Sequence, residues 1–477
     1  MRGLNIILRN RLRWAYVVTD VITTSVALFL YNVFRWSFVS DSVSLGYYMI
    51  MPKIIGGQLI FTLLLMGIYW LSGYYNKVED RSRAQEFITT ARSAGIGAVA
   101  IFFLAVVNDS AWRRRVVFES LFVAAALLFI CVYGGRYLIT RIVVRRVHER
   151  INLHEAVMIG TDGEAAALAR RINTLRKGMG LKVSAFVRLD ADGEVAEGCG
   201  GCDIIGLASL GRYCMAHAVS SMILSPRFMN DGKALASFIG LAVSHNCSLF
   251  VSPDVNTIAI ASQRSFNVIG EPLVCVSSPN IPESTVNFKR AMDVVGSAVA
   301  LVLLAPFMGL IALGIRRDSR GPVFFRQERL GYGGKPFNII KFRSMKVDAE
   351  ADGRARVTVD GDERITRFGR FLRKYRLDEL PQFVNVLRGE MSLVGPRPER
   401  RVFAELIAAR VPLYPLLYQV RPGITSWGMV RYGYASDVDQ MVERLRYDLI
   451  YLENISISTD LKILLHTVNT VVSGRGK

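Results

Sequence analysis

Two adjacent acidic residues, Asp378 and Glu379, are the side chains of this sequence best suited to carry chemistry. A run of cations comes just before them, consisting of Arg367, Arg370, Arg373, Lys374 and Arg376. The rigid turn Pro396-Arg397-Pro398 follows shortly after them. Because guanidinium and ammonium groups bind phosphate oxygens, this composition is typical of a phosphate site.

The residue types that are missing narrow the chemistry further. No cysteine follows Cys275, and no histidine lies between His245 and His466. This disfavours a Cys-His or Ser-His relay and leaves any nucleophilic or acid-base work to carboxylates. One of two neighbouring acids can attack as a nucleophile while the other holds a divalent cation that neutralises phosphate charge. The alternative is that Asp378 only caps a helix that begins near Leu380-Pro381-Gln382.

Several long motifs, in a consistent order, resemble a known family. They are KFRSM (341–345), ITRFGRFLRKYRLDELPQ (365–382), MSLVGPRPE (391–399) and RPGIT (421–425). Together they are similar to the bacterial sugar transferases, the monotopic polyprenyl-phosphate hexose-1-phosphate transferases. The resemblance is detailed over residues 281–477, whereas the first 280 residues resemble large members of the family only in layout.

The resemblance implies roles for individual residues. Asp378 matches a nucleophile that attacks the β-phosphate of a UDP-sugar, forming a phosphosugar-aspartyl intermediate as UMP leaves. Glu379 matches the residue associated with the Mg²⁺ ion, and Arg373 matches a phosphate-binding arginine. Pro396-Arg397-Pro398 matches a motif at the uridine end of the pocket. Undecaprenyl phosphate would then attack the intermediate and release a polyprenyl-diphosphate sugar.

Four apolar segments predict an α-helical membrane bundle over residues 1–150. Hydrophobic residues make up 51% of the chain, and its formal net charge is +19. A spanning helix needs roughly twenty apolar residues, and segments close to that length lie at 14–36, 54–74, 91–107 and 116–139. The positive charge suits membrane phospholipid and phosphorylated substrates. Nucleic acid is a poor partner for a chain with such segments, and no nucleic-acid motif is present.

Basic residues beside these segments predict their orientation. Clusters precede the first segment, follow the second and follow the fourth, and all three are expected on the cytoplasmic side. Their members are Arg2, Arg9, Arg11, Arg13, Lys77, Arg81, Arg83, Arg136, Arg141, Arg145, Arg146 and Arg150. Three arginines at 113–115 are an exception, because this topology places them outside.

Residues 151–256 alternate between strand and helix signals and predict a Rossmann-like α/β domain. Strands are expected at 155–159, 181–187, 221–224 and 249–251, and helices at 164–175 and 233–245. The turn Gly160-Thr161-Asp162-Gly163 follows the first strand but supplies only two glycines of a dinucleotide fingerprint. It is either a degenerate nucleotide site or a tight structural turn. A linker is expected over residues 257–280.

A further apolar helix is predicted over residues 285–317. Cations lie at both of its ends, and Pro306 stands near the middle of its apolar core, where a proline permits a kink. A complete crossing would place the following domain outside the cell, away from cytoplasmic nucleotide sugars. We therefore expect a re-entrant helical hairpin, with a kinked spanning helix as the alternative. The resemblance agrees, because Lys289, Arg290, Asp293 and Pro306 match the family's re-entrant helix.

The predicted catalytic domain, residues 281–477, is mainly α-helical. Residues 368–375 predict an amphipathic helix that either packs on the domain core or lies on the membrane and brings the acidic pair to a lipid phosphate. Lys341 and Arg343 stand among aromatic residues and are expected to bind phosphate or substrate, with a solvated loop as the alternative. Residues 438–472 predict one or two amphipathic helices.

These features predict a multi-pass bacterial inner-membrane enzyme whose catalytic domain faces the cytoplasm. We expect it to transfer hexose-1-phosphate, with glucose as the best guess, from a UDP-sugar to undecaprenyl phosphate, with Mg²⁺ as cofactor. This would initiate exopolysaccharide, capsule or O-antigen synthesis. Ser426 stands where many family members have glycine, and residues 430–438 have no match, so the sugar stays open.

Other functions and assembly states stay open as well. One alternative is a membrane glycosyltransferase that releases UDP. A second is a membrane-anchored nucleotide-sugar dehydratase, although the middle domain lacks the complete glycine fingerprint and the Tyr-x-x-x-Lys pair that such an enzyme needs. A third is a non-enzymatic scaffold. The oligomeric state is also open, with a homodimer as one alternative.

Overall fold

The computed structural model describes most of the 477 residues. The residues left undescribed are 1, 39–42, 77–82, 107–113, 149–153, 175–180, 190–194, 200, 229–230, 253–272, 279–280, 348, 350–361, 434 and 475–477. Two compact units make up the chain: Met1–Leu153 with Pro282–Phe288, and His154–Ile281 with Lys289–Lys477. Most of the expected linker at 257–280 lies outside the described residues, as do Lys77, Arg81, Arg113 and Arg150.

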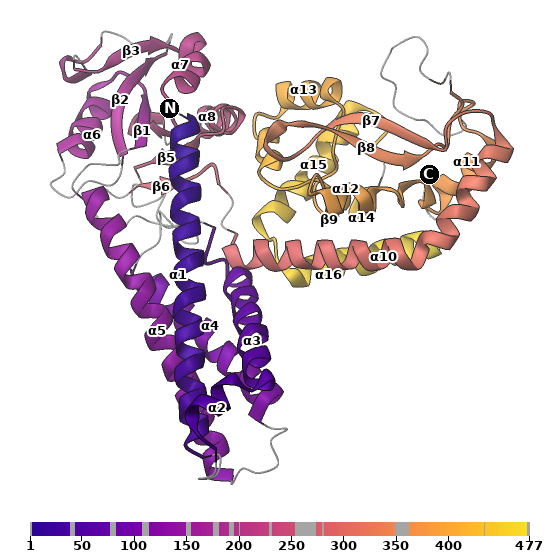
Figure 1. Cartoon of the computed structure of the whole chain (residues 1–477). Helices are drawn as coiled ribbons and strands as arrows, with labels where there is room; N and C mark the ends of the chain where they lie inside the picture. The colour runs from indigo at the N-terminus through magenta and orange to yellow at the C-terminus, as the bar shows by residue number, and fades with distance from the viewer. Residues whose placement is uncertain are drawn as a thin grey trace. The chain divides into compact units, whose positions relative to one another are not determined.

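The first unit is a bundle of helices (Figure 1). They are α1 (Arg2–Trp36), α2 (Leu45–Ile50), α3 (Pro52–Leu71), α4 (Arg83–Ile101), the π-helical η1 (Phe102–Val106) and α5 (Arg114–His148). Four stretches in this unit are long and apolar enough to cross a membrane: Arg11–Trp36, Pro52–Leu71, Arg83–Leu104 and Phe118–Val143. The predicted apolar helices are thus confirmed, and they indicate a membrane-associated protein.

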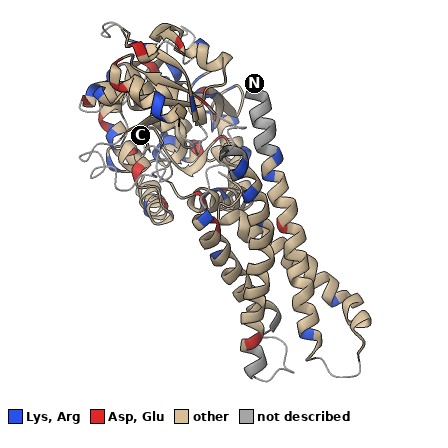
Figure 2. Cartoon of the chain, turned by 90° about the vertical axis from the view of Figure 1, so that its left-hand side faces the viewer, with Lys and Arg blue, Asp and Glu red and all other residues tan. Residues whose placement is uncertain are grey.

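Large apolar side chains cover the outer faces of this bundle. Ile22, Leu63, Phe122 and Ile130 are each more than half exposed, and Figure 2 shows few charged residues along the helices. In water such a surface would be costly, but lipid tails solvate it. The outer face of the bundle therefore fits a hydrocarbon environment.

A polar network occupies the interior of the same bundle. Arg136 of α5 and Asp20 of α1 form an ion pair of 2.6 Å, and both side chains are fully buried. The hydroxyl of Tyr75 donates to Asp20 at 2.7 Å, and Arg136 donates to Thr90 of α4 at 2.9 Å. The guanidinium also lies over the ring of Tyr74, 3.5 Å from its centroid. Three helices are thus tied together by one buried cation.

A second acid, Glu86 of α4, extends this network. Its Oε1 accepts hydrogen bonds of 3.0 Å from the hydroxyls of Tyr74 and Thr140. The hydroxyls of Thr140 and Tyr16 lie 2.8 Å apart. An unsatisfied polar group in hydrocarbon is costly, so an arrangement of the helices that breaks these bonds is disfavoured. The network therefore specifies how the bundle packs.

The middle of the chain folds around a six-stranded sheet. Its strands are β1 (His154–Ile159), β2 (Leu181–Arg188), β3 (Asp203–Gly206), β4 (Ser221–Leu224), β5 (Ser248–Val251) and β6 (Val274–Cys275). They lie in the order β3-β2-β1-β4-β5-β6, with β6 antiparallel and the others parallel. That order is the one used by doubly wound nucleotide-binding sheets.

Helices accompany the strands of this sheet. They are α6 (Gly163–Thr174), α7 (Leu210–Ala216) and α8 (Gly232–Ser244), with short 3-10 turns η2 (Glu197–Cys199), η3 (Leu207–Ser209) and η4 (Pro226–Phe228). The four predicted strands and two predicted helices are all present. Helix α7 and the strands β3 and β6 were not predicted from the sequence; β3 is mostly exposed and β6 has only two residues, so neither strand carries a strong apolar pattern.

The helix α10 (Glu283–Asp318) follows, with Pro306 inside it. It is also long and apolar enough to cross a membrane. The structure has one continuous helix that bends (Figure 1), with no separate turn between two helical arms. Proline removes one backbone hydrogen bond and clashes with the preceding turn, which bends a helix without ending it. The re-entrant topology itself stays a prediction.

The remainder of the chain is mainly helical, with two small sheets. Its elements are β7 (Phe324–Leu330), η5 (Tyr332–Gly334), β8 (Pro336–Phe342), α11 (Arg367–Lys374), η6 (Leu377–Glu379), α12 (Gln382–Arg388), β9 (Ser392–Val394), α13 (Arg401–Arg410), η7 (Tyr414–Gln419), β10 (Gly423–Thr425), α14 (Trp427–Arg431), α15 (Val438–Glu453) and α16 (Ile457–Val472). Strands β7 and β8 pair antiparallel, whereas β9 and β10 pair parallel. The amphipathic helices predicted at 368–375 and 438–472 are confirmed as α11 and as the pair α15 and α16.

The apolar side of α11 packs against α10. Leu372 is fully buried in a cluster with Ile311 and Ile315 of α10, and Phe368 contacts the same cluster. Phe371 of α11 keeps 49% of its surface exposed. The stripe therefore rests on the end of the long apolar helix, as the packing alternative predicted.

Removing the partner of the buried cation should destabilise the bundle. In Asp20→Asn, the charge of Arg136 stays buried without its counter-charge, and we expect the free energy of unfolding to fall by about 3–5 kcal/mol. The melting temperature of the purified protein in detergent measures this loss.

A matched double variant separates the charge from the packing. Asp20→Leu combined with Arg136→Met removes both charges and keeps apolar volume, so its melting temperature should lie above that of Asp20→Asn, although the hydroxyl of Tyr75 loses its acceptor. An Asp20→Asn protein that melts at the unmodified temperature would contradict the role given to this pair.

Candidate functional site

The acidic pair lies in a short 3-10 turn, η6, between two helices. Helix α11 ends at Lys374, and Arg376 then adopts a left-handed backbone conformation with φ of 54°. That conformation is strained for a residue with a side chain, and it redirects the chain into η6. Asp378 and Glu379 are consequently buried, with 8% and 7% of their surface exposed.

The alternative role of Asp378 as a helix cap is wrong. The N-cap position of α12 is occupied by Pro381, with no side-chain capping bond, and Asp378 lies three residues earlier inside η6. A buried carboxylate that does not cap a helix needs another explanation, and its neighbours supply one.

Three cations surround the carboxylate of Glu379. Lys341 of β8 donates to its Oε1 at 3.1 Å, and Arg376 places its Nε 3.5 Å from Oε2. Arg397 of the Pro-Arg-Pro turn reaches Oε1 at 4.0 Å. Burial by itself raises the pKa of Glu379, but Lys341, Arg376 and Arg397 lower that pKa to about 2. Glu379 is therefore ionised at any physiological pH.

The pKa of Asp378 is shifted in the opposite direction. Burial is the main cause that raises its pKa above the ordinary value, and the neighbouring Glu379 raises it further, while Lys341, Arg373 and Arg376 oppose the change. Environments that push the pKa values of two acids apart are a mark of divided chemical roles. A poorly solvated carboxylate such as Asp378 is suited to nucleophilic attack, whereas Glu379 is suited to a fixed negative charge.

Glu379 of the pair lines a small pocket, here called the dyad pocket. It is lined by Arg329, Ile339, Lys341, Glu379, Gln382, Arg397, Pro398, Gly423 and Ile424. Burial lowers the pKa of Lys341, and the carboxylates of Glu379 and Asp378 counteract that effect. Three cationic side chains on the wall of one pocket favour an anionic ligand with several oxygens.

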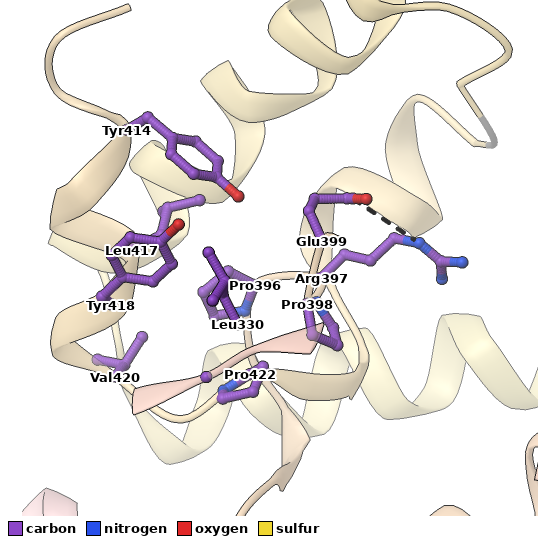
Figure 3. Close-up of a pocket in the computed structure, with 11 residues that line it drawn as sticks. Leu330, Pro396, Arg397, Pro398, Glu399, Tyr414, Leu417, Tyr418, Val420 and Pro422 are labelled. Carbon is purple, nitrogen blue, oxygen red and sulfur yellow. Dashed lines mark ion pairs between the residues drawn. The ribbon is translucent and has the colours of Figure 1, made fainter. Parts of the chain in front are cut away.

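Figure 3 shows a second pocket, here called the tyrosine pocket. It is lined by Leu330, Gly331, Pro396, Arg397, Pro398, Glu399, Tyr414, Leu417, Tyr418, Val420 and Pro422. The two pockets share Arg397 and Pro398. Figure 3 shows Tyr414 and Tyr418 on the side opposite Glu399 and Arg397. Aromatic and proline surfaces like these suit a flat ring rather than a phosphate.

The Pro-Arg-Pro turn is held in place by Glu399. This buried acid pairs with Arg444 of α15, lies 3.7 Å from Arg329 and lies 4.0 Å from Arg397. The backbone of Leu330 also donates to the carbonyl of Glu399 at 3.0 Å. The turn therefore keeps its position between the two pockets because one acid ties it to two other segments.

The predicted site residues divide into those that meet at this place and those that do not. Those lining one or both pockets are Glu379, Lys341, Pro396, Arg397 and Pro398, and Asp378 and Arg373 interact with this group electrostatically. Arg343 lines neither pocket. Its guanidinium donates to the carbonyls of Ser319 at 2.7 Å and Arg320 at 2.6 Å, so it holds the chain just past the end of α10.

The charged residues predicted for the re-entrant helix attach α10 to the elements that surround the pockets. Arg290 donates to the carbonyls of Val386 and Leu387 at the end of α12. Asp293 accepts from the backbone of Leu393 at 2.9 Å. Lys289 pairs with Asp460 of α16. These contacts fix the helix next to the strand that leads into the Pro-Arg-Pro turn.

Several residues of the site were not predicted from the sequence. Gln382, Arg329 and Tyr418 line the pockets without having been singled out. Gln382 and Glu399 both lie inside the quoted motifs, so a signal existed for them. Asp448, for which the sequence suggested no chemistry, is buried and accepts from the backbone of Gly428 at 3.0 Å.

The turn after β1 in the middle domain is closed by its own side chain. Asp162 accepts from the backbone of Ala165 at 3.0 Å, from the hydroxyl of Ser225 at 2.8 Å and lies 3.3 Å from Arg227. In a dinucleotide-binding fold the pyrophosphate occupies the N-terminus of this helix. Since a carboxylate already lies there, the geometry favours the structural turn over a nucleotide site.

Comparison with known proteins agrees with this geometry. Residues 284–474 match the family model of the bacterial sugar transferases. The chain is 44% identical over 188 residues to the UDP-N-acetylgalactosamine-undecaprenyl-phosphate N-acetylgalactosaminephosphotransferase of Aeromonas hydrophila, covering 39% of this chain and 44% of that protein. It is 38% identical to the UDP-glucose:undecaprenyl-phosphate glucose-1-phosphate transferase of Klebsiella pneumoniae, covering 50% of this chain and 52% of that protein.

The chain thus matches about half the length of these two relatives. A shorter relative is covered more fully: the UDP-glucose:undecaprenyl-phosphate glucose-1-phosphate transferase of Caulobacter vibrioides is 44% identical over 187 residues, which are 39% of this chain and 70% of that protein. The matched region contains both pockets and α10 almost completely. The chain belongs to the bacterial sugar transferase family.

Proposed function

We propose that this protein transfers hexose-1-phosphate from a UDP-sugar to undecaprenyl phosphate and releases UMP. The observation that carries the proposal is the buried acidic pair, in which three cations hold Glu379 ionised next to a poorly solvated Asp378. The printed names of the two long relatives describe this type of transfer, with N-acetylgalactosamine in one and glucose in the other. We retain glucose as the best guess.

Two displacements would complete the reaction. In the first, a carboxylate oxygen of Asp378 attacks the β-phosphorus, the bond from that phosphorus to the bridging oxygen breaks, and UMP leaves with the electron pair. In the second, an oxygen of undecaprenyl phosphate attacks the same phosphorus, and the bond to Asp378 breaks. The carboxylate is regenerated, and no other proton acceptor is required.

The surrounding cations would stabilise the charge that develops on the phosphates. Lys341 and Arg397 lie on the wall of the dyad pocket, and Arg373 acts on Asp378 electrostatically. Preorganised charges in a site of low water content stabilise a transition state more than they would in bulk water. The Pro-Arg-Pro turn would hold the uridine end, with the tyrosine pocket as a surface for its flat ring.

Magnesium fits the chemistry of the two acids. Among the described residues no group of three or more His, Cys, Asp or Glu side chains could enclose a metal by itself. Mg²⁺ usually binds through one or two carboxylates together with substrate phosphates and water. Glu379, with its pKa of about 2, would hold the ion, which would neutralise charge on the diphosphate.

The membrane would supply the second substrate. We propose that α10 enters the inner membrane from the cytoplasmic side and re-emerges there, so that the dyad pocket faces cytoplasmic UDP-sugars. The exposed face of α10 includes Val302, Leu303 and Leu310, each more than two-thirds exposed, which suits contact with lipid. The product would initiate exopolysaccharide, capsule or O-antigen synthesis.

The nucleotide released identifies the reaction. The purified protein in detergent, given Mg²⁺, undecaprenyl phosphate and a panel of UDP-sugars, should release UMP with one of them. Release of UDP instead would indicate a glycosyltransferase and would contradict phosphosugar transfer, while no release across the panel would favour a scaffold.

Replacing the nucleophile should stop turnover. Asp378→Asn keeps the shape but removes the attacking charge, so we expect UMP release to fall by about 10³-fold or more. Asp439→Asn, which changes an exposed acid of α15, is the matched control and should keep full activity. Retained turnover in Asp378→Asn would remove the assignment of the nucleophile.

The pH dependence of kcat/KM tests the effect of the charges around Asp378. Only the ionised carboxylate can attack, and burial raises its pKa, so kcat/KM should fall on the acid side at a pH above the ordinary value of 3.8. Among the cations, Lys341 lowers this pKa most. In Lys341→Gln the pKa should rise, and the acid limb should move to higher pH.

The control for that shift lies on the same hairpin. Lys335 is exposed in the connection between β7 and β8, and Lys335→Gln should leave the pH profile in place. If the acid limb of Lys341→Gln stays where it was or moves to lower pH, the proposed coupling between Lys341 and Asp378 is incorrect.

A further inference from the structure

Gln382 is a buried polar residue whose side-chain nitrogen has no partner among the described residues. It is the first residue of α12, has 2% of its surface exposed and lines the dyad pocket. Within the described part of the chain its Nε2 makes no hydrogen bond. A buried amide nitrogen left without an acceptor costs free energy, and such groups call for an explanation.

The neighbour one helical turn further on behaves differently. Asn385 of α12 is also fully buried, but its Oδ1 accepts from the backbone of Ile340 at 3.0 Å. Its Nδ2 donates to the carbonyl of Asn338 at 2.8 Å and to Glu390 at 2.7 Å. The fold therefore satisfies one amide of this helix completely and leaves the other facing the pocket.

The surroundings of Gln382 indicate what it would bind. The other polar side chains that line this pocket are the cations Arg329, Lys341 and Arg397, and the acid Glu379. Glu379 is already paired with Lys341, Arg376 and Arg397. An amide N–H can only donate, and in a pocket rich in cations the expected acceptor is an oxygen of an anionic ligand.

We propose that the Nε2 of Gln382 donates a hydrogen bond to a non-bridging oxygen of the donor's diphosphate. This inference rests on the proposed function, because it assumes that a nucleotide-sugar diphosphate occupies the dyad pocket. Gln382 would then be a binding residue that orients the diphosphate next to Asp378, without taking part in proton or phosphoryl transfer.

The test compares ligand binding with stability in the full-length protein in detergent. Gln382→Met keeps the length of the side chain and removes the amide. Calorimetric titration with UDP and with inorganic pyrophosphate should show affinities about 10- to 100-fold weaker than those of the unmodified protein, the loss expected for one hydrogen bond to a charged group. Uridine, which has no phosphate, should bind equally well to both proteins.

Melting temperature separates binding from structure. Because the Nε2 of Gln382 has no hydrogen bond to lose among the described residues, Gln382→Met should melt at or above the temperature of the unmodified protein. Asn385→Leu is the matched comparison on the same helix, and it should melt at a lower temperature because it breaks three internal hydrogen bonds. Gln382→Glu, which places a negative charge against the diphosphate, should weaken UDP binding further.

Three results would overturn the inference while leaving the proposed function intact. The first is a Gln382→Met protein that binds UDP as tightly as the unmodified protein. The second is an equal loss of uridine affinity, which would place Gln382 on the nucleoside. The third is a fall in melting temperature that accompanies the loss of UDP binding, which would make the residue structural. Failure of the unmodified protein to bind UDP and pyrophosphate would instead count against the proposed function itself.

Discussion

The burial of a carboxylate pair among cations from separate segments is the constraint on which the catalytic part depends. Glu379 is in reach of Lys341 from β8, of Arg376 from the turn after α11 and of Arg397 from the Pro-Arg-Pro turn. Removing charges from water is costly, and only close partners of opposite sign offset the cost. The three segments must therefore meet at Glu379, and this requirement places Asp378 in the same low-solvent environment.

The long apolar helix is part of the same arrangement. Arg290, Asp293 and Lys289 bind α10 to α12, to β9 and to α16. At its other end, Ile311 and Ile315 share a core with Leu372 of α11. The helix most suited to the membrane thus contacts elements on both sides of η6. A site built in this way holds its acids in a fixed position relative to α10.

Charged groups are buried in the first unit as well, but with a different consequence. Arg136 and Asp20 pair completely, and the nearby hydroxyls satisfy the remaining bonds. Such a network leaves little capacity for a ligand and specifies packing instead. The dyad pocket differs because its cations outnumber its acids and because the amide of Gln382 is left over. The dyad pocket therefore has polar groups left to bind a ligand, whereas the buried network of the first unit does not.

The sequence by itself determined the features that depend on local patterns. The length of apolar runs predicted the helices of the first unit, the alternation of strand and helix signals predicted the parallel strands of the middle domain, and the amphipathic period predicted α11, α15 and α16. The acidic pair and its neighbouring cations also stood out, because Asp378, Glu379 and Arg376 are adjacent in the chain.

Tertiary structure decided what depends on distant contacts. Lys341 and Arg397 lie far from Glu379 in sequence, so only packing brings them to it, and packing equally directs Arg343 to the end of α10. The bend of α10 follows from Pro306, which the sequence already shows, whereas the attachment of α10 to α11, α12 and α16 depends on distant contacts. Tertiary structure also decided that the Nε2 of Gln382 has no hydrogen-bond partner among the described residues. The packing of several distant segments around an atom determines whether it finds a partner, and the local sequence does not.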